Sequence, residues 1–189
     1  MGRSILLLLA LAAGQESGDE YFKFAKDTVW TYSRVEVGKA KDVTKKVVKV
    51  EGGKVFVEET TVEKGGKTPS GSHTSMLYVE DGYLKQAAVR DGKPDTAVNV
   101  FKLSSKRGDH WRLVPSDAQN KAEAMHMGVV EVETPAGTYK NAVQIRIAMN
   151  FGTVDGYLVP DVGFVKETVT VPPDAPDVQV LLKFTPGGK

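Results

Sequence analysis

Apolar and polar residues alternate through almost the whole chain after Tyr21, and short glycine-containing breaks divide the alternation into runs. Clear examples lie on either side of Gly52-Gly53 and of Asp81-Gly82. Successive side chains of a β-strand point to opposite faces of its sheet, so a period of two indicates a strand with one buried face. A glycine in the break supplies the positive φ that a tight hairpin turn needs. Turns at intervals of about eight to twelve residues are typical of an all-β meander.

The number of runs determines the shape that such a sheet can take. Further strands are predicted at residues 97–103, 127–133, 139–149, 164–171 and 178–184. The total reaches about ten, and a twisted sheet of that size curls rather than staying flat. We therefore predict a mainly β fold: an antiparallel meander curled into a half-barrel or barrel, with a sandwich as the alternative and at most one or two short helices. The helix candidate is SDAQNKAEAMH, residues 116–126, which Ser116 could cap.

The N-terminal residues differ from the rest of the chain. Arg3 precedes an apolar run from Ile5 to Ala13, and a polar stretch follows. This run is too short to span a bilayer and has the three-part form of a secretory signal. We assign residues 1–14 to a signal peptide, with an uncleaved anchor as the alternative. The predicted location is outside the cytoplasm, periplasmic or secreted, with no membrane span after cleavage.

The remaining chain is long enough for one domain, which we place at residues 21–185. Two segments within it, FKFAKDTVWTY and FKLSSKRGDHWRL, share an apolar start, a basic turn and a tryptophan. Those tryptophans, Trp30 and Trp111, are the only two in the sequence. The similarity indicates two structural halves, 21–100 and 101–185, with chance as the alternative.

Charge and cysteine content exclude several classes of function. The sequence has 25 basic and 24 acidic side chains, a net charge of +1, which gives no electrostatic reason to expect binding to nucleic acid. It contains no cysteine, which removes disulfides, thiolate catalysis and cysteine-ligated metal sites. An exported chain without disulfides fits a bacterial protein better than a small animal secreted domain.

No pattern of residues supports metal binding. The three histidines, His73, His110 and His126, are not spaced as metal ligands on one element would be. Met125 and Met127 flank His126, but alternate side chains of a strand point in opposite directions. We therefore expect core methionines beside a surface histidine, and no metal or cofactor.

No pattern of residues supports catalysis either. The segment KTPSGSHTS places Ser70, Ser72 and Ser75 near His73, but it lacks the G-x-S-x-G nucleophile elbow and is predicted to be a solvated loop. The aspartates of VEDG, RDG and VDG lie beside glycines at predicted turns, where aspartate bonds to its own backbone. No catalytic residue is nominated, and we predict that the protein is not an enzyme.

The segment VETPAGTYKNAVQI contains the most pattern-like corner in the chain. Pro135 presets φ for a turn, and Gly137 permits positive φ two positions later. A phosphate-binding loop would need more glycines and a following helix. Pro135, Ala136 and Gly137 are therefore predicted to form a structural turn that joins two strands.

Aromatic residues occur on nearly every predicted strand and have two interpretations. They fill the core if the sheet packs on itself, since aromatic side chains bury large areas. If the sheet curls around an unfilled concave face, some of them line an apolar pocket. On the second interpretation the candidate ligand-binding residues are Trp30, Tyr32, Trp111 and Tyr139.

Three segments resemble a group of bacterial exported β domains of unknown function, which includes DUF3108-like and lipoprotein-carrier-like proteins. They are AKDTVWTY (25–32), VETPAGTYKNAVQIRI (132–147) and GYLVPDVGFVKET (156–168), and the PAGT[YF]-x-N turn is the most specific of their motifs. Asp27 stands where the group has glycine, so the first turn is expected to differ. The resemblance implies a curved antiparallel sheet in the cell envelope and provides no catalytic residues.

These observations lead to one principal hypothesis and two alternatives. The principal hypothesis is an exported, non-enzymatic β domain that binds a hydrophobic ligand or an envelope partner: a lipid, a lipopeptide or an envelope protein. The first alternative is a structural or protein-interaction module without a small ligand. The second is a hydrolase whose site has no recognisable sequence pattern.

Overall fold

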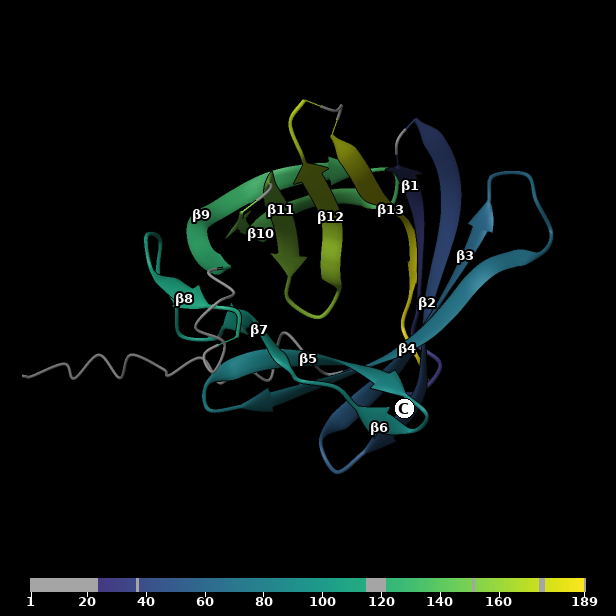
Figure 1. Cartoon of the computed structure of the whole chain (residues 1–189), viewed down its shortest axis with the longest axis horizontal. Helices are drawn as coiled ribbons and strands as arrows, with labels where there is room; N and C mark the ends of the chain where they lie inside the picture. Colours follow the sequence, from purple (N-terminus) through teal and green to yellow (C-terminus); the bar gives the residue numbers. More distant parts are fainter. Residues whose placement is uncertain (1–23, 37, 115–121, 151, 174–175, 189) are drawn as a thin grey trace, which may run out of the picture.

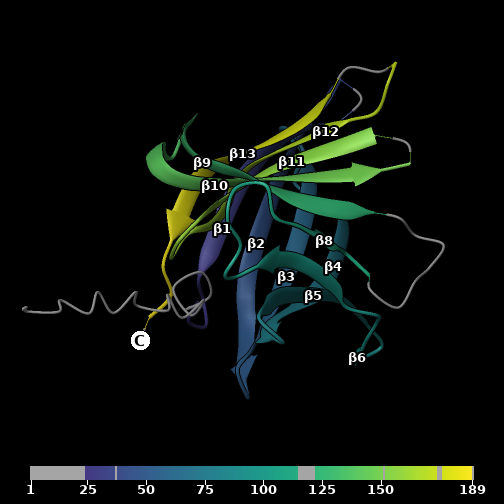
Figure 2. The same ribbon diagram turned by 90° about the vertical axis from the view of Figure 1, so that its left-hand side faces the viewer.

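In the part of the chain that the structure describes, thirteen antiparallel strands form a single curled sheet (Figures 1 and 2). The structure is a computed structural model, and it describes residues 24–36, 38–114, 122–150, 152–173 and 176–188. The strands are β1 (Val29–Glu36), β2 (Lys39–Glu51), β3 (Lys54–Glu63), β4 (Pro69–Glu80), β5 (Tyr83–Arg90), β6 (Lys93–Pro94), β7 (Val98–Lys102), β8 (His110–Arg112), β9 (Glu123–Thr134), β10 (Gly137–Met149), β11 (Gly152–Val159), β12 (Gly163–Thr170) and β13 (Asp177–Thr185).

The sheet consists of two meanders joined edge to edge. Strands β1–β5 pair in sequence order, strands β8–β13 do the same, and β1 pairs with β13 to join them. Strand β7 pairs with β5 and approaches β8, where the Asn99 N–H donates to the Leu113 carbonyl at 2.8 Å. The sheet is not closed, and the described residues contain no helix, which confirms the predicted mainly β curled meander.

The predicted hairpin turns are confirmed. Gly52-Gly53 connects β2 to β3 with φ values of 56° and 75°, and Asp81-Gly82 connects β4 to β5 with 54° and 76°. Two successive residues with positive φ form the tight turn whose twist matches that of the flanking strands. The glycine-containing breaks therefore determine the register of the first meander.

Two sequence predictions about local structure were wrong. The segment predicted to be a solvated loop around Ser70, Ser72 and His73 belongs to β4, which pairs with β3. Its side chains are exposed on both faces, so no apolar alternation marks it as a strand. The C-terminal end of the predicted helix, from Glu123, belongs to β9, because pairing with β8 and β10 outweighs a weak helix propensity. Residues 116–121 lie outside the described residues.

The position of His126 also differs from the prediction. His126 is buried and Met125 beside it is 41% exposed, the reverse of core methionines around a surface histidine. The inward face of β9 carries Ala124 and His126, because β9 pairs with Ile145 and Ile147 of β10, which face the core. The expectation of core methionines beside a surface histidine therefore exchanged the two faces of the strand.

The predicted signal peptide, residues 1–14, lies outside the described residues. Within the described ranges, no helix is long or apolar enough to cross a membrane. The assignment of residues 21–185 to one domain with two halves stays a prediction.

The two tryptophan-containing segments share two backbone features. Asp27 and Gly108 each lie three positions before a tryptophan and have φ values of 65° and 90°. The N–H of Asp27 donates to the Val47 carbonyl at 2.9 Å, and the N–H of Gly108 donates to the His126 carbonyl at 2.8 Å. Asp27 thus adopts the positive φ that glycine would adopt at this position, as aspartate does more readily than most residues.

The corner at Pro135-Ala136-Gly137 connects β9 to β10 and reaches a distant part of the sheet. The β9–β10 hairpin arches across β11–β13 towards β1 (Figure 1). At its tip, the Ala136 N–H donates to the Leu181 carbonyl of β13 at 3.2 Å, and the Ala136 side chain packs against the core. The corner therefore holds one end of the second meander against the junction between the meanders.

Replacing Gly137 with valine should lower the free energy of unfolding by about 1 kcal/mol or more. Gly137 has a φ of 144°, and an added Cβ would meet no atom within 4 Å, so the cost is one of backbone conformation alone. Gly71 is the matched control, since its Cβ would also be unopposed but its φ is not positive. Urea unfolding of both variants measures the difference, and equal costs would contradict the backbone explanation.

Candidate ligand pocket

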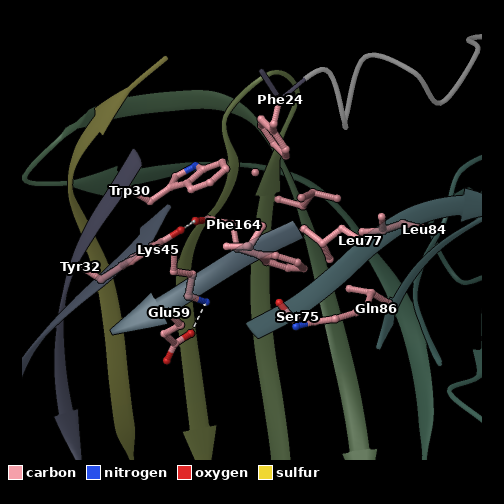
Figure 3. Close-up of a pocket in the computed structure, with 14 residues that line it drawn as sticks. Phe24, Trp30, Tyr32, Lys45, Glu59, Ser75, Leu77, Leu84, Gln86 and Phe164 are labelled. Carbon is pink, nitrogen blue, oxygen red and sulfur yellow. Dashed lines mark hydrogen bonds and ion pairs between the residues drawn. The ribbon is translucent and has the colours of Figure 1, made fainter. Parts of the chain in front are cut away.

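The core is divided into two clusters, and a pocket lies between them. One cluster contains Trp30, Tyr32 and Leu181, and the other contains Phe101 and Ile145. Residues of both clusters line a small pocket with a volume of about 80 Å³, which opens to solvent on one side. The lining residues are Phe24, Trp30, Tyr32, Lys45, Val57, Glu59, Ser75, Leu77, Leu84, Gln86, Val100, Leu158, Gly163 and Phe164 (Figure 3).

Aromatic side chains from three segments form one wall of the pocket. The ring of Phe24 meets Trp30 edge-on, with centroids 4.8 Å apart. The Trp30 indole N–H donates to the Val162 carbonyl at 2.6 Å, and the Tyr32 hydroxyl donates to the Phe164 carbonyl at 2.9 Å. These bonds fix β1 to the β11–β12 segment, so the rings are held by tertiary structure rather than by local turns.

Polar side chains occupy the opposite side of the pocket. Lys45 on β2 lies 3.3 Å from the Glu59 carboxylate on β3, and Ser75 and Gln86 face them from β4 and β5 (Figure 3). All four positions share the inward face of the sheet, because Lys45 pairs with Glu59, Ser75 pairs with Val57, and Gln86 pairs with Leu77 of the pocket lining. The pocket is therefore apolar on one side and polar on the other.

Glu59 is the centre of a wider network of ion pairs and hydrogen bonds. Arg34 Nη2 donates to Glu59 Oε1 at 3.0 Å and to Gln179 Oε1 at 2.6 Å. The Gln179 amide in turn donates to Glu167 Oε2 at 2.8 Å. Five polar side chains from β1, β2, β3, β12 and β13 are thus connected across the junction between the two meanders.

The charges of the network influence its titrating groups. Burial tends to raise the pKa of the Glu59 carboxyl, but the positive charges of Lys45 and Arg34 outweigh it and hold that pKa below its ordinary value. Burial raises the pKa of the Tyr32 hydroxyl well above its ordinary value, and the charge of Glu167 adds to the effect. Near neutral pH, Glu59 is therefore ionised and Tyr32 keeps the proton that it donates to Phe164.

The four aromatic residues predicted to bind a ligand occupy different places. Trp30 and Tyr32 line the pocket. Trp111 lies in the second cluster, where its indole N–H donates to the Asn99 carbonyl at 3.0 Å, and Tyr139 packs against the first cluster. Neither Trp111 nor Tyr139 lines the pocket, so the structure brings together two of the four.

Sequence reasoning did not nominate the polar side of the pocket. Lys45 and Glu59 stand at positions where the alternation of their strands expects an apolar residue, between Val43 and Val47 in one case and after Val57 in the other. A charged residue at an inward position is costly unless it is paired. Charged residues at inward positions of two adjacent predicted strands were therefore the sequence signal that could have located the polar side of the pocket.

Among the described residues, no three histidine, aspartate or glutamate side chains come together to form a metal site. His73 comes within 3.9 Å of Glu59 but is largely exposed. His126 is buried, with Nδ1 near the Ser105 hydroxyl at 3.2 Å. The three histidines thus lie in different surroundings.

Comparison with known proteins identifies the fold. No protein-family model and no curated protein matches the sequence. Two crystal structures cover 87% of this chain and 98% of their own, at 14% identity and a TM-score of 0.58: a proposed exported protein with a YmcC-like fold from Bacteroides fragilis and a proposed lipoprotein from Parabacteroides distasonis. The Pseudomonas aeruginosa MucA/MucB complex is more distant, with a TM-score of 0.44, 13% identity and coverage of 90% of this chain and 54% of that one.

The fold and the pocket together define a class of protein. It is a curled, open antiparallel sheet of the YmcC-like kind, with a partly apolar pocket on its concave face. The likeness at 14% identity concerns the fold alone. The resemblance to exported β domains noted from the sequence is supported at this level, and no family model matches its motifs.

Proposed function

We propose that the protein is an exported cell-envelope protein that binds a small hydrophobic ligand, such as a lipid or lipopeptide chain, in the pocket on its concave face. The observation that supports the proposal is an apolar pocket, open to solvent, lined by strands of both meanders. Ligand sites are typically concave and mostly apolar, with a few polar groups that fix orientation.

Two observations support the proposed location. The N-terminal segment has the form of a secretory signal. The two crystal structures with the same fold are described as a proposed exported protein and a proposed lipoprotein. We propose that the protein acts in the periplasm or, after secretion, in the extracellular medium.

We further propose binding without chemical turnover. Glu59, the carboxylate of the pocket, accepts from Arg34 and Lys45, so it is held ionised rather than ready to exchange a proton near neutral pH. Ser75 has no histidine partner among the described residues that could activate its hydroxyl.

The two tryptophans allow a direct test. Trp30 lies in the wall of the pocket and Trp111 lies in the second cluster, so the variant Trp111→Phe reports on the pocket through a single indole. Titration with a monomeric twelve-carbon amphiphile should change the fluorescence of Trp30 saturably. Thermal unfolding should show a matching stabilisation of about 2.7 kcal/mol when the free ligand concentration is one hundred times the dissociation constant.

Replacing Ser75 with phenylalanine should abolish this binding while the protein remains folded. Ser75 is partly exposed at the pocket, so the larger side chain fills the cavity without displacing a buried group. Ser72→Phe is the matched control, since Ser72 lies on the same strand, is exposed and does not line the pocket. The measurement is the ligand-induced shift in melting temperature. An equal shift in both variants would place the binding elsewhere.

If no amphiphile binds the wild-type protein, the ligand proposal fails. The alternative of a protein-interaction module would then gain support from a stable complex with an envelope protein, detected by light scattering. A hydrolase would instead be detected by turnover of ester, glycoside or peptide substrates.

A further inference from the structure

The polar and apolar sides of the pocket lie at opposite ends of one space. Phe24 and Trp30 lie at the apolar end, and Lys45, Glu59 and Ser75 lie towards the other (Figure 3). A ligand that satisfies both ends must be amphipathic, because an alkyl group beside Lys45 or a polar group beside Phe24 would lose solvation without a partner. The charge at the polar end therefore determines which head group fits.

Lys45 is the cation at the polar end. Its ammonium nitrogen lies 3.3 Å from Glu59 Oε2 and 5.2 Å from the centroid of the Tyr32 ring, and its side chain keeps 25% of its exposure. An ammonium group has three donors, and Glu59 uses one of them. Lys45 is thus positioned in the pocket and retains capacity for a second acceptor.

Glu59 does not depend on Lys45 for neutralisation. Arg34 approaches the other carboxylate oxygen at 3.0 Å from outside the pocket lining, so Glu59 remains paired when Lys45 turns towards a ligand. Arg34 and Lys45 both approach Glu59 directly, whereas the second carboxylate of the network, Glu167, is reached through Gln179 and does not line the pocket. This arrangement leaves Lys45 as the charge that a bound anion would meet.

Ser75 and Gln86 supply neutral donors across from Lys45. Neither side chain makes a hydrogen bond to another described residue, and both line the pocket. A hydroxyl and an amide facing an ammonium group are the donors that bind an acidic oxygen from several directions.

We propose that the pocket selects an anionic amphiphile: an aliphatic chain with one carboxylate or phosphate head, whose oxygens accept hydrogen bonds from Lys45 Nζ. This inference rests on the proposed function and specifies its ligand class. The chain lies against Trp30 and Phe24, and the head remains at the solvent-facing side beside Ser75 and Gln86.

The test compares amphiphiles that share a twelve-carbon chain and differ in their heads. Laurate, dodecyl phosphate, dodecanol and dodecylamine are titrated below their aggregation thresholds into the Trp111→Phe protein, with Trp30 fluorescence as the readout. Laurate and dodecyl phosphate should each bind at least about tenfold more tightly than dodecanol, and dodecylamine should bind least tightly. The two anions distinguish a fatty-acid ligand from a phosphate-headed lipid, since the better fitted head binds more tightly.

Variants of one strand then test the role of Lys45. Lys45→Met should remove most of the preference for laurate over dodecanol, whereas Lys45→Arg should retain the preference. Lys46→Met is the matched control, because Lys46 is adjacent in sequence, points to the other face and pairs with Asp27 at 2.8 Å.

Each result decides a different claim. Equal binding of laurate and dodecanol by the wild-type protein, or an unchanged preference in Lys45→Met, would overturn the selection of an anion while the pocket stands. Failure of all four amphiphiles to bind would overturn the proposed function itself and this inference with it.

Discussion

Truncation of Trp30 to alanine is expected to lower the free energy of unfolding by about 3–5 kcal/mol, as for other large core aromatics. The side chain is 4% exposed and packs against Phe24 and Phe184. Truncation also leaves the Val162 carbonyl without its indole donor. The change removes packing and a hydrogen bond at the same place, so both costs add to the cavity that remains. Urea unfolding followed by circular dichroism measures the difference.

Two further variants separate these contributions. Trp30→Phe retains a ring in the wall and loses only the donor to Val162, so we expect a smaller cost, about 1–2 kcal/mol. Tyr139→Phe is the control, because the Tyr139 hydroxyl makes no hydrogen bond to a described residue and its loss should change stability by less than about 0.5 kcal/mol. A cost below about 1 kcal/mol for Trp30→Ala would mean that the wall rearranges to fill the gap, and that the pocket is not preformed.

The hairpins of the first meander were predictable because their causes are local. Asp81-Gly82 and Gly52-Gly53 adopt positive φ at both turn residues, and the alternation on each side determines which face is buried. Strand β11 was missed for a local reason too. It contains Gly152, Asp155 and Gly156, residue types that a single sequence associates with turns.

The contacts between the meanders were not predictable, since they join segments far apart in the sequence. Strand β1 pairs with β13, and the Ala136 N–H reaches the Leu181 carbonyl. Alternation specifies which face of a strand is buried but not which partner covers it. For the same reason the sequence could nominate aromatic residues for a concave face but could not decide that Trp30 borders the pocket and Trp111 does not.

The lining of the pocket also depends on contacts between paired strands. Phe164 lies over Gly156, where an added Cβ would come within 2.8 Å of the ring, so this glycine leaves room for the aromatic side chain. The sequence shows that Gly156 lies in an alternating segment, and only the paired strands show what occupies the space above it. The specificity of the site therefore depends on which side chains the fold brings together, rather than on any single motif.

Replacing Glu59 with glutamine should lower the free energy of unfolding by about 2 kcal/mol at neutral pH. Breaking a fully buried ion pair costs about 3–5 kcal/mol. The cost is smaller here because the side chains of Arg34 and Lys45 remain 29% and 25% exposed. The cost should depend on pH. The folded-state pKa of Glu59 lies below its ordinary value of 4.5, so the unfolded state binds more protons between the two values. The stabilisation is therefore fully present above pH 4.5 and is lost as the pH falls through the folded-state pKa.

Urea unfolding of the wild type and Glu59→Gln across this range should show two stability curves that are separate at neutral pH and converge in acid. Glu58→Gln is the control, because Glu58 is exposed on the other face of β3, and its curve should follow that of the wild type. The same variant also connects the network to the ligand. Without the charge of Glu59, Lys45 has no competing anion, so Glu59→Gln should bind laurate more tightly although it is less stable. A parallel loss of stability and laurate affinity would instead mean that the carboxylate is needed to hold Lys45 in the pocket.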